Sequence, residues 1–136
     1  MPANAVQAYR TVDATTADPV TLTSMLYDGA IKAVKKSRLL HQQGDRQRFI
    51  AECERAYLIV GELLTTLDMQ YGELPRSLGA IYSYCLSAIT RATLGDMAML
   101  DDVEKHLTRI ALAWRTATDA LKADQARQLR ASEAVA

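Results

Sequence analysis

The chain has 136 residues, of which 49% are hydrophobic and 24% charged, and its formal net charge is zero. This length suits one domain with a single core, and the composition is typical of a globular protein. The neutral balance argues against nucleic acid as a partner, since charge attraction dominates that binding. No apolar run is long enough to span a membrane, and the N-terminus lacks the apolar core of a signal peptide, so we expect the protein to stay where it is made.

Residues 1–17 are expected to form an N-terminal arm. They are mostly small and polar, and their isolated apolar residues are too sparse to build a core face: Val6, Tyr9 and Val12. Tyr9 therefore has three possible roles, which are docking on the rest of the protein, remaining in solvent, or anchoring another protein.

The first helix is predicted to begin at Asp18-Pro19. The aspartate can cap unpaired amides, and proline at the first helical position has a favourable φ and loses no needed donor. The apolar residues that follow recur at the spacing of one buried helical stripe: Leu22, Met25, Leu26, Ala30, Ala33, Val34 and Leu40. Gly44 is expected to end this helix and Asp45 to cap the next.

The second predicted helix, residues 46–69, is apolar on more than one side. Such a helix is either central to the fold or offers a face to a partner. Pro75 is expected to open a third helix and Gly95 to end it.

The fourth helix is predicted to start after a capping Asp96 and to carry a regular seam of apolar residues as far as Leu121, the spacing of a helical bundle. Beyond Leu121 the pattern fades, which predicts a frayed or solvated helical tail. The chain is therefore expected to be all-α. Its architecture would be an antiparallel up-and-down four-helix bundle over residues 18–125, with the arm at residues 1–17 and a tail at residues 126–136.

No group of residues in the sequence predicts catalysis, a metal or a cofactor. The inward-facing Glu-x-x-His pairs of di-iron bundles are absent, as are Gly-rich phosphate loops. Asp102 and His106 share one helical face and could start a metal site, but a solvated charged face is the favoured interpretation. Cys53 and Cys85 lie within apolar periodic segments, which predicts reduced core thiols.

Several separate motifs, in order, resemble those of the flagellar secretion chaperone family FliS. They begin with Ala8-Tyr9 and the TTADPVTLTSMLYDGAI run from Thr15, and continue with ELLTTLDMQYGEL from Glu62. LGAIYSY follows from Leu78, and LDDVEKHLTRIALAW ends at Trp114. The central motif residues are Met25, Leu26, Tyr27, Asp28 and Gly29. The chain differs from the usual family pattern at Tyr71 to Pro75, and Cys85 stands where a methionine is common.

The resemblance implies a bacterial cytosolic export chaperone. Members of the family are antiparallel helical bundles that bind the disordered C-terminal segment of flagellin, prevent its premature polymerisation, and help to present it to the type III export apparatus. An export-gate component is then an expected partner and a flagellar regulator a possible one. The free protein is expected to be a monomer or weak dimer. The resemblance also implies that the arm, with Val6 and Tyr9, acts as a movable cap over apolar surface.

The surplus apolar surface of the second helix, with neighbouring residues of the third, is the candidate flagellin groove. Its residues are Leu58, Ile59, Leu63, Leu67, Leu78, Ile81, Tyr82 and Cys85. Two other interpretations stay open. The second helix could simply be the most buried one, or its surplus could form a homodimer face in a structural or adaptor protein that has no flagellin client.

Overall fold

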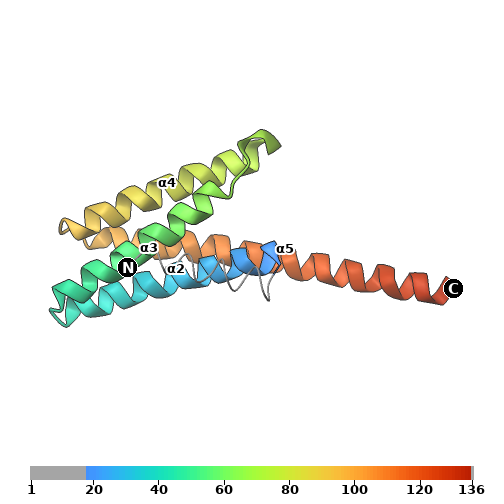
Figure 1. Cartoon of the computed structure of the whole chain (residues 1–136), viewed down its shortest axis with the longest axis horizontal. Coiled ribbons are helices and arrows are strands. Elements are labelled where there is room, and N and C mark those ends of the chain that lie inside the picture. The colour runs from blue at the N-terminus through green and yellow to red at the C-terminus, as the bar shows by residue number, and fades with distance from the viewer. Residues whose placement is uncertain (1–17, 136) are drawn as a thin grey trace.

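The computed structural model describes residues 18–135, and within that range it is helical with no strand. The helices are α2 (Pro19–Gln42), α3 (Arg46–Thr65), α4 (Glu73–Thr93) and α5 (Ala98–Val135), with a short 3-10 turn, η1 (Met69–Tyr71), before α4. Consecutive helices run in opposite directions (Figure 1). Each helix packs along two others, α2 and α4 each lying against both α3 and α5, so the bundle closes as a ring. The predicted all-α bundle is confirmed.

The predicted helix boundaries around α2 are confirmed. The Asp18 carboxylate accepts a hydrogen bond from the Thr21 amide at 2.8 Å, which holds the aspartate pKa below its usual range, and proline follows it. Gly44 has a φ of 75°, which suits glycine, and Asp45 caps α3 by accepting from the Arg48 amide. The turn is therefore short, and it sets α2 and α3 side by side.

Helix α3 ends at Thr65, four residues before the predicted end at residue 69. The hydroxyls of Thr65 and Thr66 donate to carbonyls of the last helical turn. Asp68 then accepts from the Gln70 amide and starts η1. These polar side chains offer the backbone local partners and so stop a helix whose apolar pattern would otherwise continue.

Helix α4 begins at Glu73, two residues before the predicted start. Pro75 lies in its first turn, where a missing amide hydrogen leaves no bond unmade. Gly95 has a φ of 114° and ends the segment as predicted. Asp96 does not cap α5 as expected, because its carboxylate accepts from Arg91 at 2.9 Å and α5 starts only at Ala98.

The core is a single cluster of aliphatic and aromatic side chains from all four long helices. Its largest fully buried members are Tyr82, Phe49, Leu26, Ile59, Leu63, Ile89, Leu100 and Leu107. Cys53 and Cys85 are free thiols in this core, and burial raises the pKa of Cys85 to about 11. Reduced core thiols are therefore confirmed.

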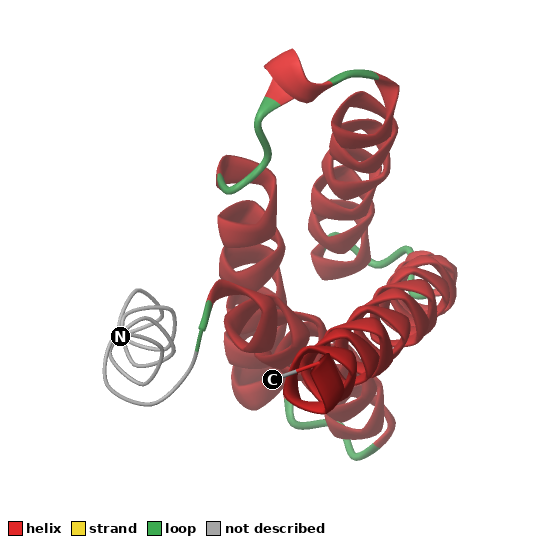
Figure 2. Ribbon diagram, turned by 90° about the vertical axis from the view of Figure 1, so that its right-hand side faces the viewer, coloured by secondary structure: helices red, strands yellow, loops and turns green. Residues whose placement is uncertain are grey.

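Helix α5 continues well past the bundle as one uninterrupted helix (Figure 1). Residues 119–135 are all exposed. Of the two predictions for the tail, frayed or solvated helix, the structure therefore shows the solvated helix. Viewed along α5, the four long helices are distinct rods, and the end of α3, η1 and the start of α4 stand away from α5 (Figure 2). None of the helices in residues 18–135 combines the length and hydropathy needed to cross a bilayer.

Candidate binding grooves

Half of the predicted groove is core. Ile59, Leu63, Tyr82 and Cys85 are at most 1% exposed. They lie on the inner faces of α3 and α4, where the ring of helices closes, and all four belong to the core cluster. In this structure these four residues therefore fill the interior and do not form an open surface. This agrees with the alternative interpretation, in which the second helix is simply the most buried one.

The other four predicted residues keep part of their surface open. Leu58, Leu67, Leu78 and Ile81 are half-buried, and the last three pack against the edge of the core. Leu67 lies close to Gly79 of α4, which follows Leu78 in the sequence. Leu58, by contrast, is not among the residues that pack against the core. The end of the bundle formed by α3, η1 and α4 therefore keeps some apolar surface that the core does not fully absorb.

The connection between α3 and α4 packs closely against α4 because residue 79 is a glycine. A Cβ atom at Gly79 would stand 2.6 Å from the Met69 Cε atom and 3.6 Å from a Leu67 methyl carbon. The absence of a side chain therefore lets Met69 lie against α4. Met69 itself is 42% exposed, so this packed end presents a flexible apolar side chain to solvent.

A pocket of about 240 Å³ opens between α4 and α5, lined by Ala80, Ile81, Tyr84 and His106. The Tyr84 hydroxyl donates to Asp102 at 2.8 Å, and this bond raises the tyrosine pKa. The rings of Tyr84 and His106 meet edge to face with centroids 5.5 Å apart. Polar contacts thus fix one wall, while Ile81 supplies the aliphatic surface that an apolar partner would cover.

The solvated charged face predicted for Asp102 and His106 is only partly confirmed, because both side chains are half-buried at this pocket. Asp102 accepts from Tyr84 and so takes part in the pocket wall. Among residues 18–135, no three His, Cys, Asp or Glu side chains group closely enough to hold a metal ion. Ala80 and Ile81 supply the rest of the pocket lining, which suits contact with an apolar side chain.

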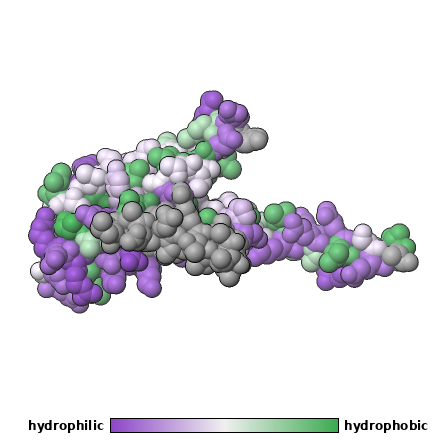
Figure 3. All heavy atoms as spheres, in the orientation of Figure 1, coloured by the Kyte–Doolittle hydropathy of each residue, from purple (hydrophilic) through white to green (hydrophobic). Residues whose placement is uncertain are grey.

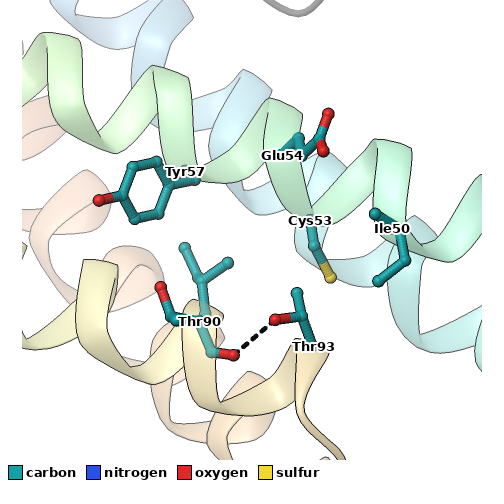
Figure 4. Close-up of a pocket in the computed structure, with 7 residues that line it drawn as sticks. Ile50, Cys53, Glu54, Tyr57, Thr90 and Thr93 are labelled. Atoms are coloured by element: carbon teal, nitrogen blue, oxygen red, sulfur yellow. Dashed lines mark hydrogen bonds between the residues drawn. The ribbon is translucent and has the colours of Figure 1, made fainter.

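A second pocket, of about 280 Å³, lies between α3 and α4 on the opposite face of α4 (Figure 4). Its lining is Ile50, Cys53, Glu54, Tyr57, Ile89, Thr90 and Thr93. The sequence analysis missed this pocket because it assigned Cys53 to the core and did not predict which helix faces this side of α3. The available signal was the spacing of Ile50, Glu54 and Tyr57, which places a carboxylate and a phenol on one face of α3.

The polarity of the surface differs between the parts of the bundle seen in Figure 3. Neutral and hydrophobic side chains gather over α4, whereas hydrophilic side chains cover the end of the bundle with the turn between α2 and α3 (Figure 3). Exposed apolar surface that is gathered on one face is a feature of interaction sites.

The central motif residues hold the bundle together. Leu26, Tyr27 and Gly29 are buried, and the exposed Asp28 pairs with Arg115 of α5 at 3.4 Å. The Tyr27 and Tyr82 hydroxyl oxygens are hydrogen-bonded, and burial raises the pKa of both phenols. This part of the motif therefore joins α2 to α4 and α5 and lines neither pocket.

Trp114 extends the same contact. Its indole nitrogen donates to the Ser24 hydroxyl at 2.9 Å, and its ring meets Tyr27 edge to face. The predicted cap residues Val6 and Tyr9 lie outside the described residues.

Comparison with known proteins gives one consistent result. The family model described as flagellar protein FliS matches residues 2–121. The flagellar secretion chaperone FliS of Bacillus subtilis (strain 168) is 32% identical over 123 residues, which cover 90% of this chain and 92% of the relative. That of Salmonella typhimurium (strain LT2) is 32% identical, covering 83% of this chain and 89% of the relative. That of Escherichia coli (strain K12) is 30% identical, covering 69% and 71%.

Proposed function

Because the chain belongs to the FliS family and is a flagellar secretion chaperone, we propose that it binds the disordered C-terminal segment of flagellin in the bacterial cytosol. Binding prevents premature polymerisation and helps to deliver flagellin to the type III export apparatus. The delivery step implies contact with an export-gate component, and a flagellar regulator is a further candidate partner. The chain acts by binding and needs no catalytic group.

The observation that carries this proposal is the apolar surface left open beside α4 in a chain that matches the chaperone family over residues 2–121. The flagellin segment carries a long apolar stripe, so a chaperone must cover that stripe reversibly. An apolar groove does so in the helix-in-groove mode. The proposed groove consists of the half-buried Leu58, Leu67, Leu78 and Ile81, together with the pocket between α4 and α5.

Several contacts of this kind are needed. Burying one leucine-sized side chain contributes about 1.5 to 3 kcal/mol. Ordering a disordered segment costs about 2 to 5 kcal/mol or more. A single pocket is therefore insufficient, and a row of half-buried aliphatic residues suits an affinity that holds the client and still permits release.

The N-terminal arm completes the proposal. Val6 and Tyr9 supply apolar side chains that can cover the groove when no flagellin is bound, which keeps the free protein from associating through it. Flagellin then displaces the arm. Deleting residues 1–14 should tighten flagellin binding or increase the binding of a dye to apolar surface, and an arm without this role would leave both unchanged.

The proposal is tested by calorimetry of the flagellin C-terminal segment with the full chain and with Ala80→Arg, which places a long charged side chain in the pocket between α4 and α5. Ala80 is exposed, so the change should leave folding intact. The matched control is Ala113→Arg, at an exposed alanine of α5 outside both pockets. We expect binding by the wild type and the control, and weaker binding by Ala80→Arg. Absence of binding by the wild type would refute the function, and equal affinities would refute this groove.

A further inference from the structure

The part of α5 that projects beyond the bundle has one side without charged residues. Steps of four and three residues in turn keep to one face of a helix. From Trp114 toward the C-terminus these steps meet no charged residue, whereas the three acidic and three basic residues of the segment 119–135 lie elsewhere on the helix. The leucines and the valine of this side are 51–89% exposed. We call it the uncharged strip, and its residues are Thr118, Leu121, Gln125, Gln128, Ser132 and Val135, with Leu129 at its edge.

The uncharged strip continues the side of α5 that faces α2. Trp114, one step before the strip, donates from its indole nitrogen to the Ser24 hydroxyl of α2 at 2.9 Å. The ion pair between Arg38 and Asp101 joins the end of α2 to the start of α5, so the two helices are antiparallel and the start of α2 lies beside the later part of α5 (Figure 1). The strip therefore extends past the start of α2.

The chain enters α2 beside the base of this projection. The pKa of the Asp18 carboxyl is lowered chiefly by the hydrogen bond from the Thr21 amide, and the positive charge of Lys122 lowers it further, so Lys122 lies near the start of α2. The N-terminal arm, residues 1–17, is joined to the bundle at this point. From Lys122 to Val135 the helix is about 20 Å long. The arm can span that length as an extended chain or as a helix.

The composition of the uncharged strip suits a tethered partner. It is apolar only at its two leucines and its valine, and glutamine, serine and threonine fill the remaining positions, so a second copy of the chain would gain little from it. A covalent tether supplies an effective concentration on the order of millimolar, which makes even a weak contact form. The charges of the segment 119–135 cancel, so it does not attract an anionic membrane surface.

We propose that the uncharged strip receives the N-terminal arm when flagellin occupies the groove. This inference rests on the proposed function, in which flagellin displaces the arm. The apolar residues of the arm, Val6, Tyr9 and Val12, follow one another at steps of three and can cover the apolar positions of the strip. They then exchange one apolar surface for another, which lowers the free-energy cost of uncovering the groove. The projection thus favours flagellin binding without contacting flagellin.

A pair of cysteines tests the contact directly. Ala8→Cys/Ser132→Cys places one thiol on the arm and one on the strip. In a glutathione buffer the two thiols form a disulfide as glutathione disulfide is reduced to two glutathione molecules, and the yield gives their effective concentration. The matched control is Ala8→Cys/Ala134→Cys, since Ala134 is exposed on the opposite side of the same helix. With saturating flagellin C-terminal segment, the strip pair should show an effective concentration about tenfold or more above that of the control.

The native thiols do not disturb this measurement. Cys53 and Cys85 are buried, and burial raises the pKa of both thiols, so little reactive thiolate is present at neutral pH.

A second measurement connects the contact to flagellin binding. Leu121→Gln/Leu129→Gln removes apolar surface at exposed positions of the strip, and Ala123→Gln/Ala134→Gln is the matched control on the opposite side. The affinity for the flagellin C-terminal segment is measured for each in the full chain and in a chain lacking residues 1–14. The leucine variant should bind several-fold more weakly than the wild type in the full chain and equally well without the arm, and the control should bind as the wild type does in both.

Equal disulfide yields in the two cysteine pairs with flagellin bound would overturn this inference, as would wild-type affinity of the leucine variant in the full chain. Equal weakening with and without residues 1–14 would also overturn it, because the strip would then contact flagellin itself. Each of these results leaves the proposed function standing. Absence of flagellin binding by the wild type would overturn the proposed function and this inference with it.

Discussion

The hydroxyl oxygens of Tyr27 and Tyr82 lie 2.5 Å apart in the interior of the bundle and join α2 to α4 across its diagonal. Both residues are at most 2% exposed, so neither hydroxyl has water as an alternative partner. Removing one hydroxyl leaves the other buried and unpaired, which costs about 1 to 3 kcal/mol, while removing both avoids that penalty. We therefore expect Tyr27→Phe and Tyr82→Phe each to lower the free energy of unfolding by that amount, measured by urea denaturation.

The double variant provides the control for this prediction. Tyr27→Phe/Tyr82→Phe should be less destabilised than the sum of the two single variants, because the two residues interact directly. Additive effects would mean that the hydroxyls are satisfied independently of each other.

The same pair predicts a loss of stability at high pH. Burial raises the pKa of both phenols above the ordinary value of 10.0, and for Tyr82 the hydrogen bond with Tyr27 raises it further. The folded state then keeps protons that the unfolded state releases, so the stabilisation is complete below pH 10 and is lost as the pH rises above it. Urea midpoints between pH 8 and 11 should fall more steeply for the wild type than for the double phenylalanine variant, and parallel curves would contradict this account.

The helices and their order could be predicted from the sequence because their signals are local. Asp18-Pro19, Gly44-Asp45 and Gly95 act through backbone geometry and capping, which need only neighbouring residues. The end of α3 was placed too late because Thr65, Thr66 and Asp68 form their own backbone bonds, and an apolar pattern does not register such competition.

The candidate site was harder to predict, because burial depends on which faces meet. Ile59 and Leu58 are adjacent and equally apolar, yet one is fully buried and the other half-buried. The pocket between α3 and α4 escaped notice for the same reason, since it combines Tyr57 and Thr90 from two helices whose contact the sequence does not specify. The sequence shows which side chains each helix carries, but the cavity between two helices forms only when those helices pack together.

Two glycines should respond to alanine in opposite directions. Gly61 lies within α3, and a Cβ there would have no atom within 4 Å, so Gly61→Ala should raise the free energy of unfolding by about 1 kcal/mol through better helix propensity. Gly44 has a φ of 75°, so Gly44→Ala should lower it by about 1 kcal/mol. Denaturant titration of both variants checks this, and changes of the same sign would contradict the turn geometry.

The ion pairs of Arg38 should matter more than that of Arg115. Arg38 joins the end of α2 to both Asp101 and Glu104 of α5, and its side chain is 29% exposed. The pair between Arg115 and Asp28 has both side chains about 60% exposed. Arg38→Met keeps the aliphatic stem and should cost about 1 kcal/mol, whereas Arg115→Met should cost almost nothing. The free energy of unfolding should be measured in low and in high salt. Its dependence on salt should be smaller than that of the wild type in Arg38→Met and unchanged in Arg115→Met.

The projecting part of α5 should contribute helix signal but little stability. Every residue from 119 to 135 is exposed, and the family match ends at residue 121, so no core contact is lost when this part is removed. A chain ending at Asp124 should keep the free energy of unfolding within about 0.5 kcal/mol of the full chain, while its circular dichroism per molecule falls because a helical segment is missing. A large loss of stability would instead show that this segment packs against a part of the molecule outside residues 18–135. The arm at residues 1–17 would then be the first place to look, by deleting it in both backgrounds and comparing the two losses.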